Sequence, residues 1–88
     1  MKVSLSPRAK KQLKNISKVD QLALANKIRS LKEDKNINQI QKLASYKNIY
    51  RVRVGDYRIV FKKSKKEIYL ILIGHRRDIY RLVNRLLR

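Results

Sequence analysis

The residues of this chain best suited to chemistry are arginines gathered around one short stretch, RVRVGDYRIVF, at residues 51–61. Polarity alternates on either side of a Gly-Asp dipeptide, which predicts a β-hairpin with a two-residue turn. Counting outward from the turn pairs Arg53 with Arg58, and alternation places Arg51 on the face that both share. Like charges on facing strands destabilise a sheet. A bound polyanion would offset that repulsion, so the arrangement predicts a site for a chain of phosphates.

A second basic group, His75-Arg76-Arg77, follows the next apolar segment at residues 67–74. Because that segment should pair with YRIVF, we expect the second group to face the same surface as the hairpin arginines. His75 alone is more typical of a structural hydrogen-bond donor, although an imidazole suits proton transfer near neutral pH. Tyr80, near the start of the last helical segment, is equally consistent with a core position and with a position in this site.

Periodicity and capping signals predict the elements that position these groups. Residues 2–5 alternate and predict a strand, and Ser6 followed by Pro7 predicts a helix with Ser6 as its N-cap. Ser17, with Asp20 three residues later, indicates a second helix. Helices joined so closely pack as an antiparallel pair. The apolar stripe of the second helix is expected at Val19, Leu22, Ala25, Ile28 and Leu31.

The second half of the chain changes to a period of two residues and then ends in a helical pattern. Strands are expected at 49–54, 57–61 and 67–74, with a polar turn at 62–66 and a connecting loop at 33–47. The predicted order is β-α-α-β-β-β-α, an α+β fold in one domain of residues 1–88. In this fold the N-terminal helical hairpin packs on one face of a small, mostly antiparallel β-sheet.

The composition and net charge of the chain exclude several classes of function. The 88 residues include no cysteine and one histidine, so no disulfide, thiolate ligand or multi-histidine metal site is possible within the chain, and no cofactor is expected. A net charge of +18 attracts nucleic acid, anionic membranes or acidic proteins. No apolar run approaches the roughly 18 residues of a membrane span, and no signal peptide is recognisable. A soluble, cytoplasmic protein is the simplest expectation.

Arginine and lysine are distributed unevenly. Eight of the ten arginines lie in residues 45–88, and arginine is the planar, bidentate ligand for phosphate, so the site is expected in that half. The KKSKK turn at 62–66 is typical of a solvated turn, with a minor role in attracting RNA. A stripe of Arg77, Arg81, Arg85 and Arg88 on the last helix fits a solvated face or a docking face for an acidic helix equally well.

Together these segments resemble the RelE/ParE toxin superfamily. The resemblance lies in the paired N-terminal helices, the hairpin YRVRVGDYRIVF, the strand IYLILI and the ending GHRRDIY, and it covers nearly the whole chain. An arginine followed shortly by Ile-Tyr is similar to the RelE branch, the ribosome-dependent mRNA interferases. The resemblance implies the toxin of a type II toxin–antitoxin system. Such a toxin is a metal-independent endoribonuclease that cleaves mRNA in the ribosomal A site and inhibits translation.

The resemblance also implies roles for individual residues. The expected catalytic residues are Arg58, Arg76, Tyr80 and His75, and the expected RNA-binding residues are Arg51, Arg53, Arg77 and Lys62. Arg58 and Arg76 would stabilise the phosphorane that forms when the 2′-OH attacks the adjacent phosphate, with Arg77 as the alternative to Arg76. Tyr80 is the candidate general base, because nearby guanidiniums favour a phenolate, and His75 is the second candidate.

The partners that the resemblance implies are mRNA, the ribosome and a cognate antitoxin with an acidic or amphipathic segment. Neither a membrane nor a small-molecule cofactor is expected. Two other functions fit the same sequence: a ParE-like inhibitor of DNA gyrase without nuclease activity, and a non-catalytic basic RNA-binding module. The arginines and Tyr80 argue against the gyrase function. A homologue that has lost activity is a further alternative.

Overall fold

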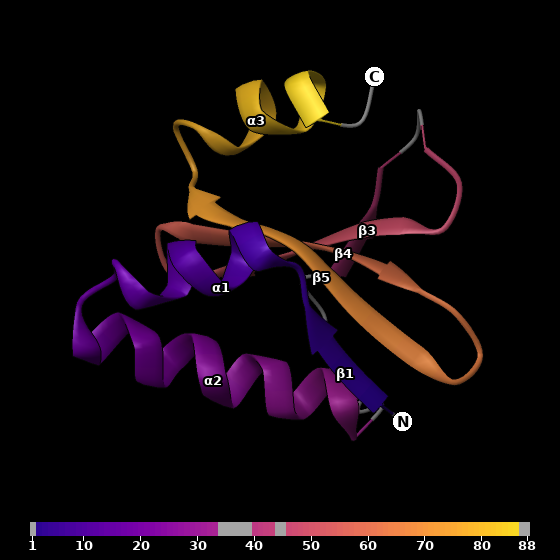
Figure 1. The fold of residues 1–88 in the computed structure, drawn as a ribbon, viewed down its shortest axis with the longest axis horizontal. Helices are drawn as coiled ribbons and strands as arrows, with labels where there is room; N and C mark the ends of the chain where they lie inside the picture. Colours follow the sequence, from indigo (N-terminus) through magenta and orange to yellow (C-terminus); the bar gives the residue numbers. More distant parts are fainter. Residues whose placement is uncertain (1, 34–39, 44–45, 87–88) are drawn as a thin grey trace.

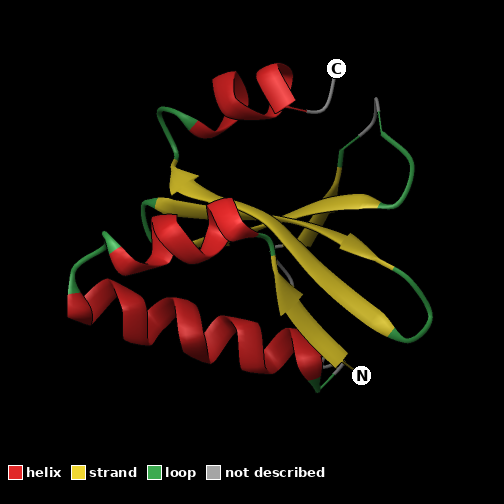
Figure 2. Cartoon of the chain, in the orientation of Figure 1, coloured by secondary structure: helices red, strands yellow, loops and turns green. Residues whose placement is uncertain are grey.

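The computed structural model describes residues 2–33, 40–43 and 46–86. Its elements are β1 (Lys2–Leu5), α1 (Pro7–Lys14), α2 (Lys18–Lys32), β2 (Ile40–Lys42), β3 (Ile49–Val54), β4 (Tyr57–Lys63), β5 (Glu67–His75) and α3 (Ile79–Leu86). The strands, yellow in Figure 2, form one sheet in the order β1-β5-β4-β3-β2. β1 is parallel to β5 and the other neighbouring strands are antiparallel. The α+β fold with a mostly antiparallel sheet is confirmed.

Both predicted helix starts are present. The Ser6 hydroxyl accepts a hydrogen bond from the Ala9 amide at 3.0 Å and donates one to the Ile71 carbonyl at 2.7 Å, so the cap also ties α1 to β5. The Ser17 hydroxyl accepts from the Asp20 amide at 3.4 Å and caps α2. These bonds satisfy amide groups that the first turn of a helix leaves without partners.

The sheet is covered on both faces. Figure 1 shows α1 and α2 on one side of the sheet and α3 on the other. The buried core on the α1–α2 side consists of Ala9, Leu24, Leu31, Val52, Ile59, Phe61, Ile68, Leu70 and Ile73. The smaller core under α3 consists of Ile49, Val60, Leu72, Ile79 and Val83. None of the described helices is long and apolar enough to cross a membrane.

The apolar stripe predicted for α2 is partly wrong. Leu24 and Leu31 are the buried residues of this helix, and Ile28 packs against them, so the core-facing row follows spacings of four and three residues. Val19 and Leu22 are instead 78% and 68% exposed. The predicted stripe follows spacings of three residues and includes both Val19 and Leu22. Because an α-helix has 3.6 residues per turn, such a stripe drifts around the helix and faces away from the sheet near its start.

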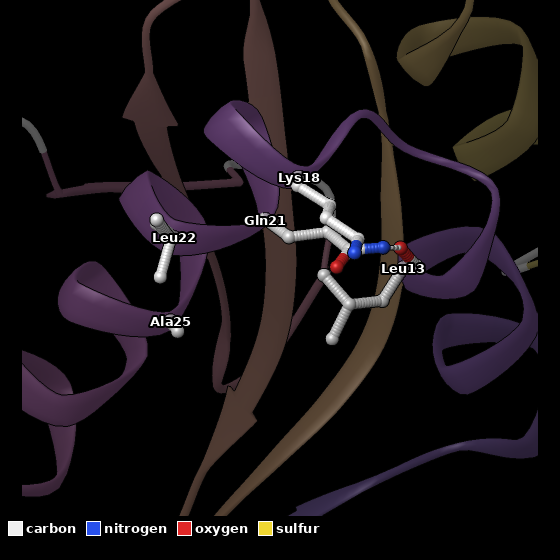
Figure 3. Close-up of a pocket in the computed structure, with 5 residues that line it drawn as sticks. All are labelled: Leu13, Lys18, Gln21, Leu22 and Ala25. Atoms are coloured by element: carbon white, nitrogen blue, oxygen red, sulfur yellow. Dashed lines mark hydrogen bonds between the residues drawn. The ribbon is translucent and has the colours of Figure 1, made fainter.

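Those exposed residues border a shallow hollow between α1 and α2. Its volume is about 380 Å³, and it is lined by Leu13, Lys18, Gln21, Leu22 and Ala25 (Figure 3). The Gln21 side chain donates to the carbonyls of Leu13 and Ile16, each at 2.9 Å, and holds the two helices together. The helical hairpin therefore presents an apolar surface with a basic residue at its border.

The loop expected at 33–47 contains a short strand. Ile40–Lys42 forms β2 and pairs with β3, placing Gln41 opposite Arg51. Three residues are too few for alternation to be recognised in a sequence. The predicted loop also includes residues 34–39 and 44–45, which lie outside the described residues, as does Arg88.

Candidate functional site

The hairpin of β3 and β4 has the register that its sequence predicts. Gly55, the first turn residue, has a φ of +60°, a conformation that favours glycine. Arg53 lies opposite Arg58, and Arg51 lies opposite Val60. The three arginines therefore share the face of the sheet that α3 covers in part.

The turn holds the Arg58 side chain in place. Its Nη1 donates to the carbonyl of Gly55 at 3.2 Å and to the carbonyl of Tyr57 at 3.0 Å. Two bonds to main-chain oxygens fix the guanidinium beside the turn, and the remaining N–H groups can take a ligand. Arg58 is thus oriented before any anion binds.

Other arginines surround Arg58 electrostatically. Burial lowers the pKa of the Arg58 guanidinium, and the positive charges of Arg53, Arg51 and Arg76 lower it further, while Asp56 raises it. The guanidinium stays protonated all the same. After burial, the positive charges of the neighbouring arginines are the next causes of this lower pKa, and a bound phosphate would offset their repulsion. We call Arg51, Arg53, Arg58 and Arg76 the arginine cluster.

Arg76 joins the cluster through the hairpin turn. Its amide donates to the Asp56 carbonyl at 2.7 Å, and its Nε lies 3.9 Å from the Asp56 carboxylate. Both side chains are more than half exposed, so the ion pair by itself adds little stability. Its effect is positional, because it keeps the segment after β5 against the turn that carries Arg58. Arg77 is exposed, and its amide bonds to His75 Nδ1 at 3.2 Å.

Tyr80 reaches the cluster from the first turn of α3. Gly74 lies opposite Arg58, and a Cβ at that glycine would be 3.2 Å from Ile79 Cδ1, so α3 packs closely there. Tyr80 is 47% exposed, and the guanidinium carbon of Arg51 lies 5.0 Å from the centre of its ring. That distance is within the range of a cation–π contact.

Gln41 is a residue of this site that the sequence analysis missed. Its Oε1 accepts a hydrogen bond from Arg51 Nε at 3.1 Å and a second one from Arg51 Nη2. The bidentate contact orients the guanidinium that lies against the Tyr80 ring. Only recognition of β2 could have revealed Gln41, because its position depends on pairing with β3.

Two of the expected site residues lie apart from the cluster. His75 is opposite Tyr57 and contacts its ring edge-on, with 5.8 Å between the ring centres, so it is on the α1–α2 face. Lys62 is on the α3 face but four residues from Arg58, which is roughly 13 Å along a strand. The structure brings together Arg51, Arg53, Arg58, Arg76 and Tyr80 and leaves His75 and Lys62 elsewhere.

The cluster has a definite chemical capacity. Several guanidiniums beside one another can bind a phosphate and stabilise additional negative charge on it. The phenol beside them can exchange a proton. Within the residues that the structure describes, no group of three or more histidine, aspartate or glutamate side chains is placed to hold a metal ion.

Comparison with known proteins identifies the class. A family model described as the ParE toxin of a type II toxin–antitoxin system, parDE, matches residues 3–80. The chain belongs to the RelE/ParE superfamily of type II toxin–antitoxin toxins. A curated relative, Toxin RelE3 of Methanocaldococcus jannaschii, is 34% identical over 62 residues, covering 70% of this chain. The match spans 65% of that relative's length.

Solved structures agree with this assignment. The fold is similar to RelE in the RelB–RelE antitoxin–toxin complex from Methanococcus jannaschii, with a TM-score of 0.75 and 26% identity over 89% of this chain and 95% of that one. The isolated E. coli RelE toxin has a TM-score of 0.74 over 99% and 98% of the two chains, and at 19% identity it supports the fold alone. Within the superfamily, the chain is in the RelE-like branch.

Proposed function

We propose that this protein is an endoribonuclease that cleaves mRNA in the ribosomal A site and so inhibits translation. The observation that carries the proposal is the convergence of the arginine cluster and Tyr80 at one end of one sheet face. Arg51 and Tyr80 are in contact, and Arg51, Arg53 and Arg76 all act electrostatically on Arg58. Family membership supports the proposal, which places the protein in the cytoplasm with its substrate.

The proposed reaction is an intramolecular phosphoryl transfer. The 2′ oxygen forms a bond to the adjacent phosphorus, and the bond from phosphorus to the 5′ oxygen of the next nucleotide breaks. The products are a 2′,3′-cyclic phosphate and a 5′-hydroxyl end, so neither an added nucleophile nor a metal ion is required. Negative charge grows on the phosphorane oxygens, and in this proposal Arg58 and Arg76 stabilise it; their electrostatic interaction supports the assignment.

Proton transfer is assigned to Tyr80. In this proposal Tyr80 acts as its phenolate, with the guanidinium carbon of Arg51 5.0 Å from the centre of its ring. Tyr80 then accepts the proton of the 2′-OH as the oxygen attacks, and the departing 5′ oxygen takes a proton from water. The position of His75 on the opposite face of the sheet favours Tyr80 as the base.

We propose that the ribosome holds the mRNA in the precise orientation that the reaction requires. Holding the 2′-OH in line with the phosphate removes much of the entropic barrier to attack. The arginine cluster then needs only to bind phosphates and stabilise charge. A chain of only 88 residues can perform these two tasks when the ribosome orients the mRNA.

We also propose a cognate antitoxin with an acidic, amphipathic segment. The similar structures include RelB–RelE complexes from Methanococcus jannaschii and from E. coli. In this chain, the exposed Val19 and Leu22 beside the hollow between α1 and α2 offer an apolar surface, and Lys18 borders it. An amphipathic acidic segment would complement both features.

A reconstituted translation system tests the proposed reaction. Purified protein added to ribosomes that carry a defined mRNA should produce cuts in the A-site codon, with cyclic phosphate and 5′-hydroxyl ends. The cuts should persist in chelator concentrations that still leave ribosomes assembled. Absence of cleavage, with the protein folded and ribosomes active, would overturn the proposal.

The family model favours a second candidate function. Its description names ParE of the parDE system, and a ParE-like protein would inhibit DNA gyrase by protein–protein contact without cutting RNA. Trapping of gyrase on DNA, with growth arrest that persists in Arg58→Ala and Tyr80→Phe variants, would identify that function. Arrest that these substitutions relieve would support the nuclease.

A further inference from the structure

The two ends of β4 that carry positive charge are on the same face of the sheet but have different surroundings. At the end opposite the arginine cluster, Lys62 pairs in register with Tyr69 of β5. These residues, with Ser64 and Glu67, line a hollow of about 270 Å³, which we call the Tyr69 hollow. Tyr69 is 37% exposed, so part of its ring faces solvent although its strand lies inside the sheet.

The Tyr69 hollow is suited to an anion with an aromatic group. Lys62 is exposed, and Lys65 and Lys66 of the following turn are exposed as well. Glu67 is the acidic residue of the lining, and its carboxylate accepts a hydrogen bond from the Ser4 hydroxyl at 2.8 Å. Lysines around an aromatic ring are the chemistry with which proteins bind single-stranded nucleic acid, since each base has a face that can stack.

The Tyr69 hollow and the arginine cluster lie on the same face of the sheet, at the two ends of β4. Lys62 and Arg58 are separated by four residues of β4, roughly 13 Å along the strand. The residues between them, Val60 in β4 and Leu72 in β5, are buried under α3. The direct path between the two places is therefore covered by α3, where Arg85 is exposed.

We propose that the Tyr69 hollow is a second binding site for the RNA strand held at the arginine cluster. A base a few nucleotides from the cleaved phosphate stacks on Tyr69, and its phosphate contacts Lys62. This proposal rests on the proposed function for the identity of the strand, but its test measures binding and needs no cleavage. Lys62 is thereby assigned to affinity for the flanking RNA and not to the reacting phosphate.

Binding of single-stranded RNAs of increasing length to the purified full chain tests the proposal. RNAs with 2′-O-methyl groups prevent cleavage, and fluorescence anisotropy measures the dissociation constant. The wild-type affinity should rise in a step when the RNA becomes long enough to span both places. Tyr69→Val should weaken binding of long RNA about fivefold or more and leave short RNA unaffected. Valine keeps the strand preference of the position.

Matched variants separate stacking from charge. Tyr69→Phe retains the ring and should bind as the wild type does. Lys62→Ala should lower the slope of log affinity against log salt by about 0.7 for long RNA, the value for one phosphate contact on a single strand. Lys10→Ala, on the helical side of the sheet, is the charge-matched control and should leave the length-dependent step in place.

Long RNA with abasic residues distinguishes stacking on Tyr69 from nonspecific electrostatic attraction to the basic surface. If abasic RNA gains as much affinity with length as normal RNA, or if folded Tyr69→Val retains the wild-type step, there is no stacking site and the proposal is overturned. Tyr69→Val protein that does not fold is replaced by Tyr69→Leu for the same measurement. If the stacking site is absent but A-site cleavage occurs, only the second binding site is rejected and the proposed nuclease function is retained. If affinity rises with RNA length but no cleavage occurs, the nuclease function is rejected and the second binding site is retained.

Discussion

The two ends of β4 both carry positive charge, but the surrounding structure constrains them differently. At the Gly55 end, Arg58 bonds to main-chain carbonyls and Arg51 bonds to Gln41 and contacts Tyr80. At the other end, the lysines of residues 62–66 are exposed. Side chains fixed in advance lose little entropy when a reaction requires them, which suits catalysis. Exposed lysines suit attraction and affinity.

The largest effect is expected from Arg58, whose guanidinium is held by two main-chain carbonyls. Arg58→Ala should slow A-site cleavage by about 10²–10³-fold, because a preoriented donor to the transferring phosphate is lost. The measurement is the rate of mRNA cutting on ribosomes. Arg29→Ala, on α2, is the matched control and should retain nearly full activity. A loss below about tenfold for Arg58→Ala would remove the distinction between the two ends.

Tyr80→Phe separates the hydroxyl from the ring. The substitution keeps the aromatic face that contacts Arg51, so the fold and RNA affinity should be unchanged. Cleavage should fall by about 10²-fold, the lower range for loss of a general base. Single-turnover cleavage and RNA binding, measured on the same protein, check both statements. Full activity in Tyr80→Phe would assign proton transfer to another group.

Gln41 should have a smaller effect, because it acts through Arg51. Gln41→Ala should lower the cleavage rate by about tenfold or less and leave the melting temperature nearly unchanged, since its contact is exposed. Gln41→Glu, which keeps an acceptor oxygen for the Arg51 guanidinium, should retain most of the rate. Lys42→Ala, its exposed neighbour in β2, is the control. Equal losses in Gln41→Ala and Gln41→Glu would show that Gln41 does not position Arg51.

The smallest effect concerns stability. Arg53 and Arg58 face each other as like charges, so Arg53→Gln should raise the free energy of unfolding by about 0.2–1 kcal/mol at low salt. The gain should shrink at high salt, because salt screens exposed charges. Chemical denaturation at two ionic strengths, with Arg29→Gln as control, measures it. A stabilisation that does not depend on salt would indicate a cause other than charge repulsion.

The hairpin and its arginines could be predicted because alternation and a two-residue turn determine register together. His75 was harder to place. The sequence put His75 and Arg76 in one group because they are consecutive and basic, and it did not show where β5 ends. The strand extends through His75, which pairs with Tyr57, so alternation turns its ring to the α1–α2 face, whereas Arg76 follows the strand and bonds to Asp56 of the hairpin turn.

Gln41 and the buried row of α2 were missed for other physical reasons. β2 exists because it pairs with β3, and a three-residue strand has little preference of its own. In α2, two apolar rows compete, and only packing against the sheet selects the row that contains Leu24. Local patterns thus predicted the elements and the hairpin residues, whereas long-range packing determined which helix face is buried and which polar residue supports Arg51.

The hydrogen bonds of Arg58 go to carbonyl oxygens, which every amino acid possesses. Amino-acid replacements around the turn can therefore accumulate during evolution without releasing the guanidinium, provided that the backbone keeps its path. The strongest constraint then falls on the left-handed geometry at Gly55. Divergent descendants of this protein should share the shape of that bend more faithfully than the chemistry of the side chains beside it.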